Sequence, residues 1–223
     1  VDEDYPFFIS GEFSMPYRIM RIREMAAEKD ILGIEDFKRM ITDNHSSYAF
    51  MLTPLIISSA AAAGAEDEKI SKVLEELKGW NYDMSASLVA PTLFEFVRIE
   101  LARHIMLDEL DELYGSTLGR QHDFYIYSMV NKGPDEWIDN TDTPEKETIE
   151  KIMAQSIRAA IDTLTARYGE YGDNWQWGKI HTFTLEHPMG GVKILNRLLG
   201  LNSKTYGIDG SYHTVEPYAY RDN

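Results

Sequence analysis

The sequence predicts a mainly α protein with a short β segment near its C-terminus. Through most of residues 1–170 the apolar residues recur every three or four positions, which is the spacing of amphipathic helices. Over 171–223 this pattern gives way to a two-residue rhythm and to glycine-rich turns. With 223 residues, 43% of them hydrophobic, the chain can bury a substantial core. We therefore expect a helical region over 1–170, followed by a joint and a short β and turn-rich segment over 171–223.

The helices expected in the first region lie at about 14–28, 34–62, 66–78, 91–114, 120–131 and 144–168. Acidic residues in the first turn of the second helix suit the helix dipole. Pro54 is expected to break or kink that helix, because proline lacks the N–H that an interior position needs. In the last helix, Thr143 is the expected N-cap, Pro144 the first residue and Gly169 the C-cap.

Residues 173–188 form the joint between the two kinds of structure. Two of the four tryptophans and two of the six histidines of the chain lie within it. Ile180, Phe183 and Leu185 alternate with polar neighbours, which predicts a half-buried strand. Trp175 and Trp177 are expected to be hydrophobic anchors of this joint rather than a ligand-stacking site.

Charge and composition exclude several function classes. The net charge of -15 would repel a nucleic acid, and the basic residues form no stripe that could offset it. No apolar run reaches the roughly 18 residues of a membrane span. The absence of cysteine rules out disulfides, thiolate nucleophiles and zinc-thiolate sites. The G-x-S-x-G, G-x-G-x-x-G and phosphate-loop patterns are also absent, so serine-triad catalysis and nucleotide binding have no signal.

Three groups of residues resemble metal sites, and none of the three is expected to bind a metal ion. His181 and His187 are six apart, but no third ligand has a useful spacing, so structural hydrogen bonds are favoured. The loop that starts at Asp139 resembles a calcium loop with Glu150 at its twelfth position, yet Pro144 stands where that loop needs glycine. A solvated helix face is favoured for the acidic run of Asp108, Glu109, Asp111 and Glu112.

The joint also carries a family resemblance. Residues 174–181 (N-W-Q-W-G-K-I-H), followed by His187-Pro188, resemble the W-x-W-G-x-x-H and HP patterns of the penicillin acylase family of N-terminal nucleophile hydrolases. Further segments match the family's β chain in the same order and cover nearly the whole sequence. They are Asp4-Tyr5-Pro6, Ile9-Ser10-Gly11, 17–22, 37–43, 52–55, 77–81, 207–211 and Thr214-Val215. The resemblance implies that this chain is an internal part of the β chain and contributes the helical domain of the αββα fold.

The resemblance implies an amide hydrolase that acts on N-acyl compounds, such as the side chains of β-lactams. In this family an N-terminal serine is the nucleophile and its own α-amino group is the base. An asparagine side chain and a backbone N–H stabilise the oxyanion. Here that asparagine would fall just before Val1 and the serine lies outside the chain, so we expect the chain to be inactive alone. Arg18 matches the family arginine that supports the asparagine, with Arg21 as the alternative in register and an ordinary surface arginine as the structural alternative.

The resemblance also implies partners and a location. The calcium of the complete enzyme would use mainly upstream carboxylates, and the one contributor from this region aligns near Ile9, which cannot ligate it. No cofactor or metal is therefore expected in this chain. The expected partners are the remaining α- and β-chain segments of the acylase and a small N-acyl substrate. The expected location is extracytoplasmic, either periplasmic or secreted.

Three alternatives stay open at this stage. The enzyme could be an acyl-homoserine lactone acylase rather than a β-lactam acylase. The chain could instead be a standalone acidic helical module for binding or interaction, or an unrelated acidic helical enzyme. If its strands normally pair with absent ones, exposed edges over 179–185 should make the isolated chain dimerise or aggregate.

Overall fold

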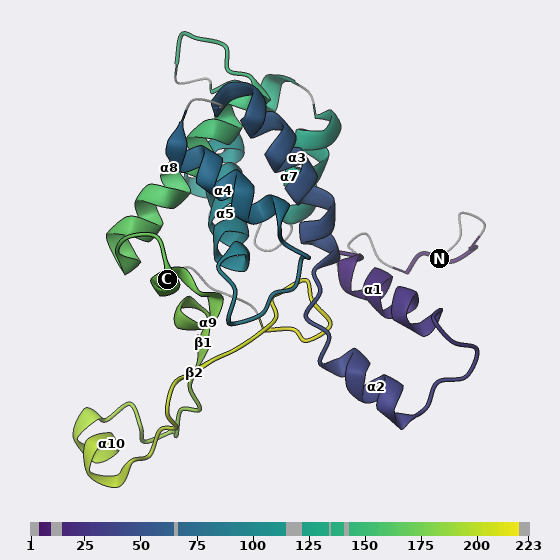
Figure 1. The fold of residues 1–223 in the computed structure, drawn as a ribbon, viewed down its shortest axis with the longest axis vertical. Coiled ribbons are helices and arrows are strands. Elements are labelled where there is room, and N and C mark those ends of the chain that lie inside the picture. The colour runs from purple at the N-terminus through teal and green to yellow at the C-terminus, as the bar shows by residue number, and fades with distance from the viewer. Residues whose placement is uncertain are drawn as a thin grey trace.

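The computed structural model describes residues 5–9, 15–64, 67–114, 122–133, 135–140 and 143–218. The described part is mostly helical, as the sequence predicts, and its strands form one two-stranded sheet. Figure 1 shows a helical bundle with two extensions, one formed by α1 and α2 and the other a long arm that ends in α10. None of the helices within these ranges is long and apolar enough to cross a membrane.

The bundle consists of α3 (Ser47–Gly64), α4 (Glu68–Lys78), α5 (Ala90–Leu110), α7 (His122–Lys132) and α8 (Ile149–Tyr168). The helices outside it are α1 (Tyr17–Ala26), α2 (Ile34–Ile41), α9 (Trp177–Ile180) and α10 (Lys193–Leu199). Short 3-10 turns lie at η1 (Asp111–Leu113), η3 (Asp135–Trp137) and η4 (Asp173–Trp175). The antiparallel strands are β1 (Thr182–Phe183) and β2 (Tyr206–Gly207), with Thr182 opposite Gly207.

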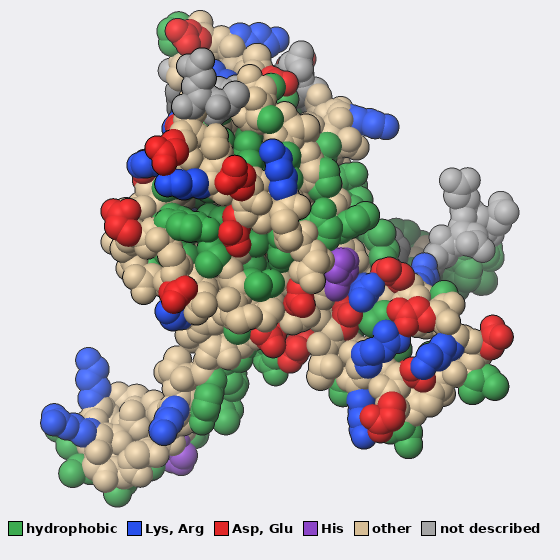
Figure 2. Space-filling view, in the orientation of Figure 1, with side chains coloured by type: hydrophobic (Ala, Val, Ile, Leu, Met, Phe, Trp, Pro, Cys, Tyr) green, Lys and Arg blue, Asp and Glu red, His purple; other side chains and the backbone are tan. Residues whose placement is uncertain are grey.

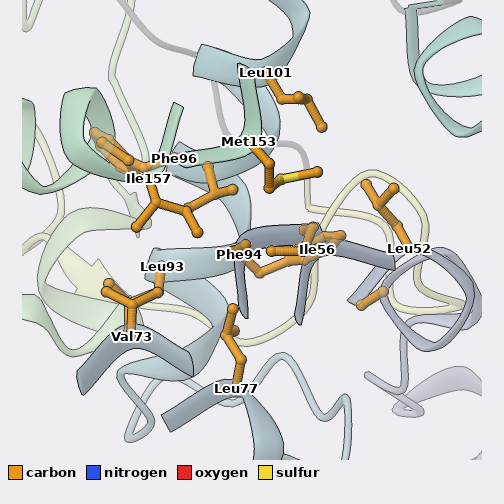
Figure 3. Packing of buried hydrophobic residues seen from close by; sticks show 14 of the residues in the cluster. Leu52, Ile56, Val73, Leu77, Leu93, Phe94, Phe96, Leu101, Met153 and Ile157 are labelled. Carbon is orange, nitrogen blue, oxygen red and sulfur yellow. The ribbon is translucent and has the colours of Figure 1, made fainter. Parts of the chain in front are cut away.

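The hydrophobic core lies where α3, α5 and α8 pack together. Figure 3 shows side chains from all three helices converging, among them Ile56, Phe94 and Ile157. Each of these side chains is at most 1% exposed. Burying one such side chain contributes about 1.5–3 kcal/mol, so this contact is what closes the bundle.

The helix expected over 34–62 is two helices, α2 and α3, separated by residues 42–46. The second begins anew because the Ser46 hydroxyl accepts a hydrogen bond from the N–H of Ala49 at 3.1 Å, as an N-cap does. Pro54 lies inside α3 and does not end it. The chain therefore turns before α3 rather than within it, which directs α1 and α2 away from the bundle.

The helix expected over 144–168 begins at Ile149, so Thr143 is not its N-cap. The cap is Thr148, whose side chain accepts from the N–H of Lys151 at 3.4 Å. Residues 143–147 form a loop instead, because the Glu147 carboxylate accepts hydrogen bonds from the N–H of Asn140 and from the Thr143 hydroxyl, both at 3.1 Å. These side-chain bonds compete with helical ones and delay the start of the helix.

The strand expected over 180–185 is reduced to Thr182 and Phe183, and Ile180 ends the single helical turn α9. The N–H of Gly178 donates to the carbonyl of Ala86 at 2.8 Å, and that of Trp177 to the carbonyl of Leu88 at 2.8 Å. The Trp177 indole N–H donates to the carbonyl of Gly210 at 3.0 Å. The joint is therefore a packed junction between the start of α5 and the C-terminal segment.

Gly178 allows this close approach, and replacing it should be costly. A Cβ at Gly178 would lie 2.6 Å from the Cβ of Ala86, whereas a Cβ at Gly191 would meet nothing within 4 Å. We expect Gly178→Ala to lower the free energy of unfolding by about 1–3 kcal/mol, because the extra carbon overpacks the junction. Gly191→Ala is the matched control and should change it little. Urea denaturation of both variants measures this, and equal losses would contradict the prediction.

Candidate functional site

Arg18 joins the first helix to a loop almost two hundred residues further along the chain. Its Nε–H donates to the carbonyl of Thr214 at 3.1 Å, and its Nη2 donates to the carbonyl of Tyr212 at 2.8 Å. The side chain is half-buried, and no carboxylate among the described residues pairs with it. A guanidinium has five N–H donors, so Arg18 is oriented by two carbonyls while it keeps its charge and donors for a further partner.

Arg21, the alternative in register, lies in a different environment. Its guanidinium binds both carboxylate oxygens of Asp43, at 3.0 and 2.8 Å, and one oxygen of Glu24 at 3.0 Å. The hydrogen bonds to Asp43 are the main cause of the raised pKa of Arg21. Because its charge is already neutralised, Arg21 clamps α1 to the 42–46 connection and is poorly suited to a second partner. Of the two arginines, Arg18 is therefore the one that pairs with no carboxylate among the described residues.

A pocket of about 270 Å³ opens beside Arg18. Apolar side chains of α1 and of the residue two positions before it line one side, and the 211–214 loop lines the other with Tyr212 and His213. Its apolar members are Met15, Ile19 and Ile22. A polar group that entered this pocket would meet the Arg18 guanidinium beside three apolar side chains, and a hydrogen bond to a charged donor is stronger than one between neutral groups.

Behind the pocket lies a buried ionic network that the sequence analysis missed. His213 Nε2 is 2.6 Å from Asp123 Oδ2, and Arg98 Nη1 donates to Asp123 Oδ1 at 2.7 Å. Arg98 also binds Glu95 Oε2 through two nitrogens, at 3.0 and 2.7 Å. Asp123, His213 and Glu95 are each 4% exposed. The sequence held one signal, since Glu95 and Arg98 are charged residues three apart in an otherwise apolar part of the α5 helix.

The pKa values in this network follow from the pairing. Burial alone would raise the pKa of Asp123, but Arg98 and His213 outweigh it and lower that pKa to about 2. The burial of Tyr17 raises its own pKa to about 12, and the negative charge of Asp123 contributes to this increase. The rings of Tyr17 and Tyr48 lie 5.1 and 4.7 Å from the His213 ring. His213 is therefore fixed by one carboxylate and two neutral aromatic side chains.

His181 and His187 each make a local structural hydrogen bond. The His181 ring stacks on Trp177 with centroids 4.5 Å apart, and its Nδ1 lies 3.2 Å from the carbonyl of Ile208. Burial lowers the pKa of His181, which favours its neutral form. His187 is exposed, and its Nδ1 accepts from the N–H of Met189 at 3.1 Å. The structure thus gives both histidines an architectural role in the joint.

The acidic segments, like the two histidines, make structural hydrogen bonds. Across the described ranges no three His, Asp or Glu side chains gather as metal ligands would. In the calcium-like loop, Asp139 Oδ1 accepts from the N–H of Glu147 at 3.1 Å, so the carboxylates serve the backbone. Burial and a hydrogen bond with Asp108 raise the pKa of Glu109 to about 7. Ile9 is 55% exposed and has no ligating atom in its side chain, so the residues present do not fit the family's calcium.

The Asp123 network predicts a specific dependence of stability on pH. The pKa of Asp123 is lower in the folded chain than its ordinary value of 3.8, so its contribution is complete above that value and is lost as the pH falls towards 2. At pH 7, Asp123→Asn should cost about 3 kcal/mol of unfolding free energy, because Arg98 loses one of its two carboxylate partners in the interior. Between pH 5 and pH 2 the gap from the unmodified chain should narrow by up to about 2 kcal/mol.

Denaturant titrations across this pH range measure the gap. Asp162→Asn is the matched control, because the Asp162 side chain is 74% exposed and its distance to Lys69 is 3.8 Å. That variant should cost little at any pH. A gap for Asp123→Asn that stays constant as the pH falls would contradict the assignment of the low pKa to Asp123.

Comparison with known proteins identifies the family of the chain. The penicillin amidase family profile matches residues 1–223. Acyl-homoserine lactone acylase QuiP from Pseudomonas aeruginosa is 25% identical over 200 residues, which cover 82% of this chain and 24% of the relative. Proteins of the same name from Pseudomonas putida and Pseudomonas syringae pv. tomato are 22% and 23% identical, over 82% and 85% of this chain and 25% of each relative. The chain thus spans about a quarter of the length of the curated relatives it matches. Because the profile matches its whole length, this chain belongs to the penicillin amidase family.

Proposed function

We propose that this chain is the helical scaffold portion of an enzyme that hydrolyses the amide bond of N-acyl compounds through an N-terminal serine on another segment. The family match supports the reaction class. The observation that carries the chain's own part is the setting of Arg18, which lies in a pocket wall, is oriented by two carbonyls and has no carboxylate partner among the described residues. On this proposal the chain has no activity by itself, because the nucleophile is elsewhere.

The contribution of Arg18 follows from the chemistry of acyl transfer. Negative charge develops on the carbonyl oxygen of the substrate as the tetrahedral intermediate forms, and fixed N–H donors stabilise it. An asparagine side chain has one acceptor oxygen and one donor nitrogen. If the Arg18 guanidinium binds that oxygen, it polarises the amide and directs the nitrogen towards the oxyanion. Arg18 would thus act on the asparagine rather than on the substrate.

The acyl-homoserine lactone acylases among the relatives favour N-acyl homoserine lactones over β-lactam side chains as the substrate class. The test is to incubate the complete protein that carries this chain with an N-acyl homoserine lactone and with a penicillin. Release of homoserine lactone and a free fatty acid supports the first class, and release of the free β-lactam amine supports the second. Hydrolysis of neither would refute the proposed function. An extracytoplasmic location fits either substrate and stays part of the proposal.

The two extensions favour an assembled enzyme over a standalone module. Figure 2 shows apolar side chains on both of them. Ile34 of α2 is 75% exposed and Leu198 of α10 is 74% exposed. Further exposed apolar residues of these extensions are Ile31, Phe37, Ile41, Ile194 and Leu199. Apolar surface of this extent marks an interaction site, and the remaining segments of the acylase are the partners we propose for it.

The role of Arg18 predicts a selective loss of rate. Arg18→Lys keeps the charge but replaces the planar fork with a point charge, so the asparagine should be held less well. In the complete enzyme we expect kcat to fall about tenfold or more with little change in KM, since the interaction forms in the transition state. Arg23→Lys is the matched control, because Arg23 is an exposed residue of the same helix. Unchanged kcat in a folded Arg18→Lys enzyme would contradict this role.

The exposed arm predicts self-association of the isolated chain. With its partner segments absent, the apolar face of α10 should drive association at micromolar concentrations. Leu198→Lys should shift the chain towards monomer in sedimentation velocity. Leu113→Lys is the matched control, since Leu113 is 58% exposed but lies on the bundle. A clean monomer at all concentrations would contradict the prediction, as would equal effects of the two substitutions.

A further inference from the structure

The loop that orients Arg18 is held from two sides. The carbonyls of Tyr212 and Thr214, which accept from Arg18, stand on either side of His213 in the sequence. The ring of His213 points away to Asp123 at 2.6 Å. Residues 212–214 are therefore held at two points. Arg18 binds the main-chain carbonyls of the outer two residues, and Asp123 binds the side chain of His213 between them.

The hydrogen bonds continue from His213 into the bundle. Asp123 belongs to α7 and is held by Arg98 of α5, which is held in turn by Glu95 one turn earlier. None of the three carboxyl and imidazole groups is more than 4% exposed. In such surroundings each charged hydrogen bond has few alternatives, so the positions of Arg98, Asp123 and His213 are coupled.

We propose that Arg98, Asp123 and His213 are positioning residues for catalysis that act through Arg18. They fix the carbonyls of residues 212 and 214, and these carbonyls fix the direction of the guanidinium. The proposal rests on the proposed function, because it assigns these residues to the reaction in which Arg18 takes part. On this proposal the rate of hydrolysis also depends on buried residues of the bundle that do not touch the substrate.

The loop is also held just before it begins, where the N–H of Gly210 donates to the carbonyl of Met84 at 2.8 Å and the Gly210 carbonyl accepts from the Trp177 indole N–H at 3.0 Å. Within it, the N–H of Ser211 donates to the Thr214 hydroxyl at 2.8 Å, which closes a turn but does not anchor that turn to the bundle. Beyond it, the N–H of Glu216 donates to the carbonyl of Asp43 at 3.0 Å. If the His213 ring loses its partner, both carbonyls can shift relative to α1. A displacement of about 1 Å in a catalytic group costs up to about a hundredfold in rate.

The first experiment measures the loop without reference to activity. Hydrogen exchange of the peptide that spans 208–218 is followed by mass spectrometry in the complete protein. His213→Leu should accelerate exchange in this peptide at least about tenfold, whereas His213→Gln, which keeps a donor near the Nε2 position, should stay close to the unmodified protein. Arg98→Lys, which loses the fork between Glu95 and Asp123, gives a second way to loosen the loop if His213→Leu does not fold. Unchanged exchange in the folded variants would overturn the proposal.

The second experiment measures the coupling to Arg18. In a double-mutant cycle, Arg18→Lys and His213→Leu should each lower kcat about tenfold with little change in KM, and the double variant should be no slower than either single one. Independent, multiplying losses would overturn the proposal, as would a folded His213→Leu enzyme with normal kcat. His104→Phe is the matched control, because His104 is a half-buried histidine of α5 whose Nδ1 lies 2.8 Å from the Glu100 carbonyl, outside this loop, and the kcat of this variant should be normal.

The two experiments separate the proposals. If the unmodified complete protein hydrolyses no N-acyl substrate, the proposed function fails, and the positioning role in catalysis fails with it. The exchange experiment still decides whether the network holds the loop. If the substrate is hydrolysed but the cycle shows independent losses, the proposed function stands and only the positioning role is overturned.

Discussion

The buried carboxylate of Asp123 is the constraint on which the rest of the candidate site depends. A charge in the interior costs several kcal/mol unless partners surround it, and here Asp123 and its two partners come from three separate parts of the chain. Arg98 belongs to α5 and Asp123 to α7. His213 belongs to the C-terminal segment, which its contact with Asp123 holds against the bundle. Because the same segment then accepts hydrogen bonds from Arg18, the first helix is placed by a contact that begins inside the core.

The pattern that carries the family resemblance has a structural role in this chain. Trp175 and Trp177 donate their indole N–H groups to the carbonyls of Gly169 and Gly210, and Gly178 leaves room for Ala86. This junction fixes where the chain leaves α8 and where its tail returns. It therefore determines that the 211–214 loop reaches Asp123, although none of the junction residues lines the pocket beside Arg18.

Helical periodicity was sufficient to predict the bundle, because its helices bury continuous apolar faces. It failed where side chains compete with the helix, at Ser46 and at Glu147, since such bonds depend on local geometry that spacing does not encode. The resemblance singled out Arg18, with Arg21 as its alternative, and the structure adds that the charge of Arg21 is neutralised by Asp43. The Asp123 to His213 contact joins residues 90 apart, so no local pattern predicts it.

The bundle and the arm that ends in α10 differ in how much apolar surface they expose. The interior of the bundle is closely packed, since Phe94 is 1% exposed, although Phe50 of α3 and Phe124 of α7 are 57% and 48% exposed. The arm that ends in α10 is not closed, and it carries Lys193, Arg197 and Lys204 in a chain of net charge -15. The exposed apolar surface of this arm is thus accompanied by local positive charge in an acidic chain. Arg18 belongs to α1 in the other extension, and its bonds to the carbonyls of Tyr212 and Thr214 connect that extension to the loop that Asp123 holds.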